Sequence, residues 1–142
     1  MASIKRITPG TRMSQAVVSN GLVFCAGQVA RKGGATVADQ TKAITEQIDE
    51  LLAAAGSDKS QLISANIWLT DIGTWAEMNT VWDAWLPKDC GPARATVEAK
   101  LANPIYKVEI AVVAAAGGRA APLKAKPKAK AKAKAKAKAR RR

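Results

Sequence analysis

The positive charge of this chain is concentrated at its C-terminal end, and this division decides which residues can fold. The 142 residues carry a formal net charge of +12 at pH 7. Residues 1–118 contain eleven basic and eleven acidic residues, whereas residues 119–142 contain twelve basic residues and no acidic ones. Closely spaced lysines repel one another and offer little apolar surface to bury. We therefore predict one folded domain over residues 1–118 and a disordered basic Lys/Ala/Pro/Arg tail over residues 119–142.

The absence of histidine restricts the chemistry available to the domain. It removes the usual general base of Ser-His and Cys-His hydrolases and the commonest ligand of transition metals. Cys25 and Cys90 form no zinc-binding pattern, and we expect both to be reduced, with Cys25 as inert packing in an apolar strand. The longest apolar run, residues 110–116, is too short to cross a bilayer. We therefore expect a cytoplasmic protein without a membrane span.

Short-range signals predict a β-hairpin and a further strand. Residues 15–19 and 22–26 are rich in β-forming residues and flank Asn20-Gly21, the pair that best tolerates a two-residue turn with positive φ angles. In residues 63–70 apolar side chains alternate with polar ones, beginning with a buried Ile63. We expect this segment to be a strand with one buried face.

Two amphipathic helices are predicted from apolar residues at helical spacing. The first covers residues 37–55, with Thr36 as its N-cap and a glycine after its last turn. The second lies between Thr74, which forms a capping box with Glu77, and Pro87, which ends it.

The order of these elements predicts an α+β fold. Residues 94–99 and 106–114 form two final strands, so the chain runs hairpin, helix, strand, helix and two strands. A strand, helix, strand succession implies parallel pairing, so we expect a mixed sheet with both helices on one face. The other face would leave apolar side chains in water, which predicts self-association through the sheet.

Arg94 and Glu109 are the best candidates for a reactive pair. If the last two strands pair antiparallel around a turn at residues 101–102, the two side chains lie opposite each other. A guanidinium can hold an anionic substrate while the carboxylate orients or deprotonates a water. A cross-strand salt bridge without catalytic function is the alternative from the residues alone.

Six segments of the chain resemble, in the same order, the signature segments of the reactive-intermediate deaminase (Rid) family. This family is also called YjgF-like and, in older descriptions, L-PSP endoribonuclease. The segments are RMSQAV (12–17), FCAGQV (24–29), IWLTD (67–71), MN (78–79), PARATVE (92–98) and VEI (108–110).

The resemblance implies a chorismate-mutase-like fold and a homotrimer whose sheets face the central axis, with an active site in each cleft between subunits. It implies hydrolysis of small 2-imino or 2-enamino acids to 2-oxo acids and ammonia, without a metal or organic cofactor. Residue by residue, Arg94 matches the arginine that holds the substrate carboxylate and Glu109 the acid that positions the attacking water. Gly27 would present backbone groups to the substrate, and Asn79 matches a polar residue that lines the cleft.

Three positions of the expected substrate-binding set depart from the family pattern. Met13 stands where many members have tyrosine, Ala26 where they have serine, and Thr96 where many have cysteine. Two hydroxyl groups are therefore missing from the expected pocket, which predicts a changed substrate preference.

The tail supports a second hypothesis of a different class. Its twelve basic side chains could neutralise nucleic-acid phosphates. A trimeric domain would then present three polycationic tails and could associate with the nucleoid. The alternative is a solubilising appendage that binds polyanions without specificity. An endoribonuclease mechanism is the least favoured interpretation, because the chain has no histidine and the tail lies outside the expected cleft.

Overall fold

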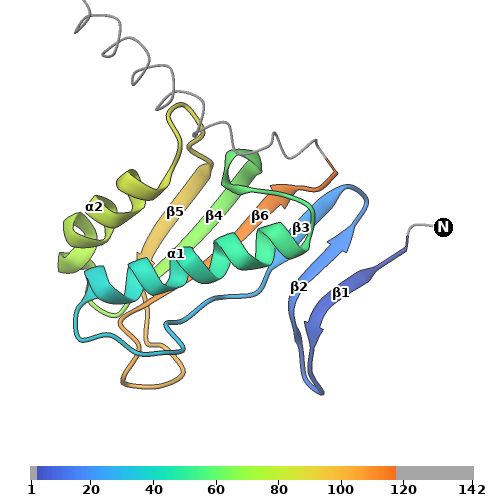
Figure 1. Cartoon of the computed structure of the whole chain (residues 1–142). Helices are drawn as coiled ribbons and strands as arrows, with labels where there is room; N and C mark the ends of the chain where they lie inside the picture. The colour runs from blue at the N-terminus through green and yellow to red at the C-terminus, as the bar shows by residue number, and fades with distance from the viewer. Residues whose placement is uncertain (1–2, 118–142) are drawn as a thin grey trace, which may run out of the picture.

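The computed structural model describes residues 3–117, which form one mixed β-sheet with two α-helices across one face (Figure 1). The predicted tail lies outside the described residues. In chain order the elements are β1 (Lys5–Pro9), β2 (Ser14–Ser19), β3 (Leu22–Cys25), α1 (Val37–Ala54), η1 (Lys59–Gln61), β4 (Leu62–Leu69), η2 (Ile72–Thr74), α2 (Trp75–Trp85), β5 (Ala93–Glu98) and β6 (Val108–Ala115). No helix within residues 3–117 has the length and apolar character needed to cross a membrane.

The strand order is β1-β2-β3-β6-β4-β5. Strands β4 and β5, joined through α2, pair in parallel, and the remaining neighbours pair antiparallel. The mixed sheet and the placement of both helices on one face confirm the predicted α+β class. The predicted pairing of the last two strands is wrong, because β4 lies between β5 and β6. The β4–α2–β5 crossover makes β5 the edge strand, and β6 then pairs on the other side of β4.

The predicted hairpin is confirmed. Strands β2 and β3 pair antiparallel, with Ser19 opposite Leu22. Asn20 and Gly21 have φ angles of 50° and 72°, as the two-residue turn requires. Strand β1, which adds to the other side of β2, was not expected from the sequence. Only Ile7 of its five residues is buried, so its apolar alternation is weak.

Helix α1 is confirmed with local signals at both ends. The Thr36 side chain accepts a hydrogen bond from the Asp39 backbone N–H. At the other end Gly56 has a φ angle of 73°, and the N–H groups of Gly56 and Ser57 donate to the carbonyls of Ala53 and Leu52. This pair of bonds is a Schellman motif, which satisfies the last free carbonyls of the helix.

Helix α2 forms where predicted, but the capping box at its start does not. The Thr74 side chain donates to the carbonyl of Asp71, and it makes no capping bond to the helix. Glu77 Oε2 instead accepts from the backbone N–H of Ala38, 3.1 Å away in the first turn of α1. Glu77 therefore binds a backbone N–H in the first turn of α1 instead of forming the predicted capping box within α2.

The core lies between the helices and the sheet. Its fully buried residues include Ile44 and Ile48 of α1, Met78 of α2, and Ile67 of β4. Ile63, predicted to be buried, is 46% exposed. A register shift between β4 and β6 at residues 62–64 adds one residue to β4, which reverses the alternation before Ala65.

Candidate active site

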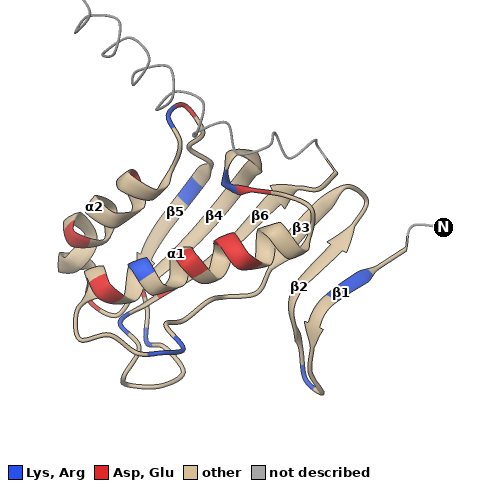
Figure 2. Cartoon of the chain, in the orientation of Figure 1, with Lys and Arg blue, Asp and Glu red and all other residues tan. Residues whose placement is uncertain are grey.

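Arg94 lies on the edge strand β5 and points toward the helices. Its Cα is paired with that of Ala65, which belongs to the buried face of β4. The guanidinium carbon lies 5.5 Å from the centroid of the Trp82 ring of α2, over the ring face. The sequence of β5 contains one basic residue, Arg94, and Figure 2 shows a basic position on this strand. Trp82, a buried core residue of α2, thus also supports the guanidinium of the predicted substrate-binding residue.

Two further predicted residues provide unused polar atoms on the same side of the sheet. Thr96 follows Arg94 on the inward face of β5 and is paired with Ile67. Asn79 lies on α2, one turn before Trp82. Thr96 Oγ1 and Asn79 Oδ1 are both buried and have no hydrogen-bond partner within residues 3–117. Such atoms are rare in folded proteins and suggest a site where a further group binds. We call Arg94, Thr96 and Asn79 the Arg94 half-site.

Glu109 lies on β6 and points away from the helices. Its neighbours Val108 and Ile110 are fully buried in the core, and its Cα is paired with that of Trp68 on the outward face of β4. The carboxylate covers Gly27 so closely that a Cβ added there would overlap Glu109 Oε1 and lie 3.0 Å from Cδ. Gly27 therefore has to be glycine for Glu109 to keep this position.

Gly27 and Ala26 belong to the segment that follows β3. The Ala26 backbone N–H donates to the carbonyl of Gln15, 2.9 Å away on β2. The next residue, Gln28, exchanges both backbone hydrogen bonds with Ile110 on β6. We call Glu109, Gly27 and Ala26 the Glu109 half-site.

The two half-sites do not meet within one chain. Strand β4 separates β5 from β6, and Arg94 and Glu109 point to opposite faces of the sheet. The predicted pairing of these two side chains is therefore wrong, both as a catalytic pair in a single chain and as a cross-strand salt bridge. Met13 lies between β1 and β2 and is 48% exposed. The sequence analysis thus placed Arg94 and Glu109 on the correct strands but paired those two strands with each other incorrectly.

The Cys25 thiol is buried in β3 and lacks the environment of a reactive thiolate. Burial raises the pKa of the Cys25 thiol to about 11, so it stays protonated at neutral pH. This confirms Cys25 as packing. Cys90 is a partly exposed free thiol in the loop before β5.

A partly buried contact between the helices contains a carboxylate with a shifted pKa. Trp85 Nε1 donates to both carboxylate oxygens of Asp49, at 3.1 and 3.0 Å. Burial raises the pKa of Asp49, while the Trp85 hydrogen bond and the charge of Lys59 act in the opposite direction. The Lys59 Nζ atom lies 5.6 Å from the centroid of the same indole. This group joins α1 to α2 and contains no predicted site residue.

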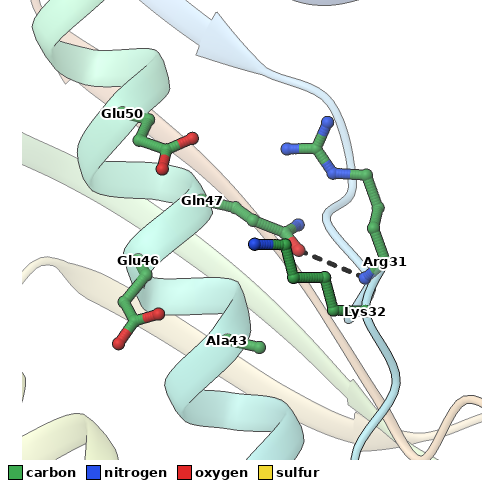
Figure 3. A pocket seen from close by; sticks show the side chains of 6 residues that line it. All are labelled: Arg31, Lys32, Ala43, Glu46, Gln47 and Glu50. Carbon is green, nitrogen blue, oxygen red and sulfur yellow. Dashed lines mark hydrogen bonds between the residues drawn. The ribbon is translucent and has the colours of Figure 1, made fainter.

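An open pocket of about 320 Å³ lies beside α1 (Figure 3). Arg31 and Lys32 line one side, and Ala43, Glu46, Gln47 and Glu50 line the helical side. Gln47 Oε1 accepts a hydrogen bond from the Arg31 backbone N–H at 3.1 Å. None of the predicted catalytic or substrate-binding residues lines this pocket, so it is separate from both half-sites.

Comparisons with known proteins agree with the architecture. A family model described as endoribonuclease L-PSP matches residues 3–116. A RutC family protein from Haemophilus influenzae is 44% identical over 113 residues, which cover 79% of this chain and 97% of that protein. A crystal structure of a YjgF family member from Neisseria meningitidis has a TM-score of 0.78 and 46% identity, covering 80% of this chain and 95% of that chain. A chloroplastic protein of Arabidopsis thaliana named Reactive Intermediate Deaminase A is 29% identical over 107 residues, 71% of this chain and 57% of that protein.

Proposed function

Because this chain belongs to the endoribonuclease L-PSP family, also called the YjgF-like or Rid family, we propose that it hydrolyses small 2-imino acids to 2-oxo acids and ammonia. The observation that carries the proposal is the pair of half-sites. One offers a guanidinium and, on the same side of the sheet, two buried oxygen atoms that have no hydrogen-bond partner within residues 3–117, and the other holds a carboxylate against Gly27. Each half-site alone lacks one of the two groups that the reaction needs.

We propose that a homotrimer completes the site. Two surfaces on opposite sides of one chain can meet only between copies, and a head-to-tail contact that closes on itself forms a ring. The outward face of the sheet favours such an assembly, because Phe24 and Val97 on it are 45% and 50% exposed. Each cleft would then combine the Arg94 half-site of one protomer with the Glu109 half-site of the next.

In this site the guanidinium of Arg94 would bind the substrate carboxylate through two parallel hydrogen bonds. A 2-enamino acid first takes a proton from solvent at C3 to become the iminium ion, whose C2 is electrophilic. Glu109 would accept a proton from a water molecule as the water oxygen bonds to C2, which gives a neutral carbinolamine. Glu109 would then return this proton to the carbinolamine nitrogen and accept the hydroxyl proton as the C2–N bond breaks, which releases ammonia and the 2-oxo acid. Since an imine is already reactive, orientation supplies much of the catalysis.

The variable positions would set the substrate preference. Ala26 and Met13 offer no hydroxyl group to a substrate, and we therefore expect their side of the cleft to favour imino acids with short apolar side chains. Thr96 Oγ1 can donate or accept a hydrogen bond and Asn79 Oδ1 can accept one, so both would bind polar groups of the substrate.

The test is release of 2-oxo acid and ammonia from an imine generated in situ by an amino-acid oxidase or a dehydratase. Replacing Arg94 by Ala removes a charged partner of the substrate, an effect worth about 2–4 kcal/mol, or roughly 30- to 1000-fold in kcat/KM. Arg31→Ala, an exposed arginine outside both half-sites, is the matched control and should retain full activity. An unchanged kcat/KM in Arg94→Ala would exclude the proposed site.

A second candidate function is nucleic-acid binding through residues 119–142, which hold all twelve excess basic charges. Counterion release predicts that the affinity of the full chain falls steeply with salt concentration. Gel shifts at several salt concentrations should therefore show binding by residues 1–142 and not by a chain ending at residue 118. The same reactions with RNA also test for cleavage. Equal binding by both chains would exclude this function for the tail.

A further inference from the structure

We propose that Gln28 and Gln47 are positioning residues that hold Gly27 against the Glu109 carboxylate. The inference rests on the proposed function, because it assigns a role to residues that support the Glu109 half-site. Neither side chain belongs to a half-site. Both side chains form hydrogen bonds within residues 26–31. This segment contains Ala26 and Gly27 and lies outside the named helices and strands.

Gln28 connects this segment to two strands. Its side chain is almost fully buried, and its Nε2 donates to Gln15 Oε1 at 3.1 Å and to the Ala26 carbonyl at 3.0 Å. Its backbone N–H and carbonyl bond to Ile110 at 2.8 and 3.0 Å. Gln28, the residue after Gly27, is therefore bonded to Ile110, the residue after Glu109. A shift of Gln28 would change the contact between Gly27 and the Glu109 carboxylate.

Gln47 continues the network from helix α1. Its Nε2 donates to Gln28 Oε1 at 3.2 Å and to the Val29 carbonyl at 2.9 Å. Its Oε1 accepts from the Arg31 backbone N–H, which Figure 3 shows at the edge of the open pocket. Three backbone groups of the segment, at Ala26, Val29 and Arg31, thus depend on two buried side-chain amides.

The fit at Gly27 leaves little tolerance for movement of this segment. The space for a Cβ at Gly27 is already taken by the Glu109 carboxylate. A small displacement of the backbone would therefore either push the carboxylate aside or open a gap beneath it. A misplacement of about 1 Å can lower the rate of an oriented reaction roughly 100-fold.

Gln40 provides a matched control from the same helix. It is also fully buried, and its Nε2 donates to the carbonyls of Gly34 and Ile105 at 2.9 Å. Its Oε1 accepts from the Lys107 backbone N–H at 2.8 Å. Gln40 thus resembles Gln28 and Gln47 in burial and bonding, but it makes no bond to residues 26–31.

The experiment compares Gln28→Met, Gln47→Met and Gln40→Met in the full-length protein, since methionine preserves the shape and removes the hydrogen bonds. We expect all three to lower the melting temperature. Only Gln28→Met and Gln47→Met should lower kcat, by about 10- to 100-fold, with KM changed less than about threefold. Hydrogen exchange at the backbone amides of residues 28 and 31 should rise in the same two variants. Gln47→Glu retains the acceptor for the Arg31 N–H but sets a carboxylate oxygen against the acceptor oxygens of Gln28 and Val29, so it should lower kcat at least as much as Gln47→Met.

The outcomes separate this inference from the proposed function. A wild-type protein without imine hydrolysis refutes the function, and the inference is then decided by a crystal structure of Gln47→Met. In that structure a Glu109 carboxylate moved away from Gly27 supports the positioning role, and an unmoved one overturns it. In an active wild type, an unchanged kcat in Gln28→Met and Gln47→Met, or an equal loss in Gln40→Met, overturns it as well.

Discussion

The two cysteines have contrasting environments and should differ in reactivity. Cys25 is buried in β3, where its pKa is about 11, whereas Cys90 is partly exposed in a loop. Because the thiolate is the reactive species, an alkylating reagent at neutral pH should label Cys90 in the folded protein and Cys25 only after unfolding. Mass spectrometry of the labelled peptides measures both sites, and Cys90→Ser should leave the folded protein unlabelled. Equal labelling of both cysteines in the native state would contradict this expectation.

Asp49 should give the protein a measurable pH dependence. Burial raises its pKa in the folded state, so its contribution to stability is largest below the unfolded pKa of about 3.9 and is lost as the pH rises through the folded value. Asp49→Asn keeps an acceptor for Trp85 without the charge. At neutral pH we expect the variant to be more stable than wild type by less than about 1 kcal/mol, since the carboxylate is partly screened by solvent.

Denaturant unfolding across the acidic range provides the measurement for Asp49. The advantage of Asp49→Asn over wild type should shrink as the pH falls through the raised pKa. Asp83→Asn, on an exposed position of α2, serves as the comparison. A difference between Asp49→Asn and wild type that stays constant with pH would show that the charge of Asp49 carries no penalty in the fold.

At the scale of single residues, sequence reasoning found the chemical groups but not their neighbours. Arg94 and Glu109 stood out because an assumed turn at residues 101–102 placed them opposite each other and because both match signature segments of the family. Whether their side chains lie close together depends on the order of the strands in the sheet, and this order is set by contacts between segments that are distant in the sequence. The amide of Gln28 gave no sequence signal of its own, since a buried glutamine is recognised only by its hydrogen-bond partners.

The end of helix α1 depends on the backbone conformation of Gly56. Its φ angle is 73°, in the region that an alanine enters only at a cost of about 1–2 kcal/mol. Gly56→Ala should therefore lower the free energy of unfolding by about that amount. Gly91→Ala is the control, because an added Cβ there meets open space and its φ is not positive. Thermal or denaturant unfolding compares the two, and equal effects would refute the role assigned to the Gly56 conformation.

The elements show why some predictions succeeded. The hairpin and α1 were predictable because Asn20-Gly21 and the Thr36 cap act within a few residues. The capping box of α2 failed because Glu77 found a partner 39 residues away, the N–H of Ala38. Ile63 was misplaced by a register shift that depends on pairing with β6. Local chemistry therefore specified where helices and turns form, while the sheet decided their neighbours.

Within residues 3–117, no helix or strand covers the sheet face opposite the helices (Figure 1). Along one line across β2, β3 and β6, the residues Val17, Phe24 and Val113 are paired in register on this face. Val97 is paired with Trp68 on the neighbouring strands β5 and β4. An apolar row of this kind is stabilised when another copy covers it. We therefore expect self-association through this face, and it is the step that would bring Arg94 of one copy to Glu109 of another.

A site shared between protomers predicts complementation between two inactive variants. Arg94→Ala and Glu109→Gln should each be inactive alone, yet an interface that joins the intact Arg94 of one chain to the intact Glu109 of the other would be complete. If the chains mix at random in a ring, about a quarter of the interfaces are complete, so co-expression should restore about a quarter of wild-type activity. Native mass spectrometry would verify the mixed oligomers. Co-expression of Arg94→Ala with the Arg94→Ala/Glu109→Gln double variant allows no complete interface and should stay inactive. If the mixed oligomers are no more active than either single variant, Arg94 of one chain does not act with Glu109 of another, and the proposed shared site is refuted.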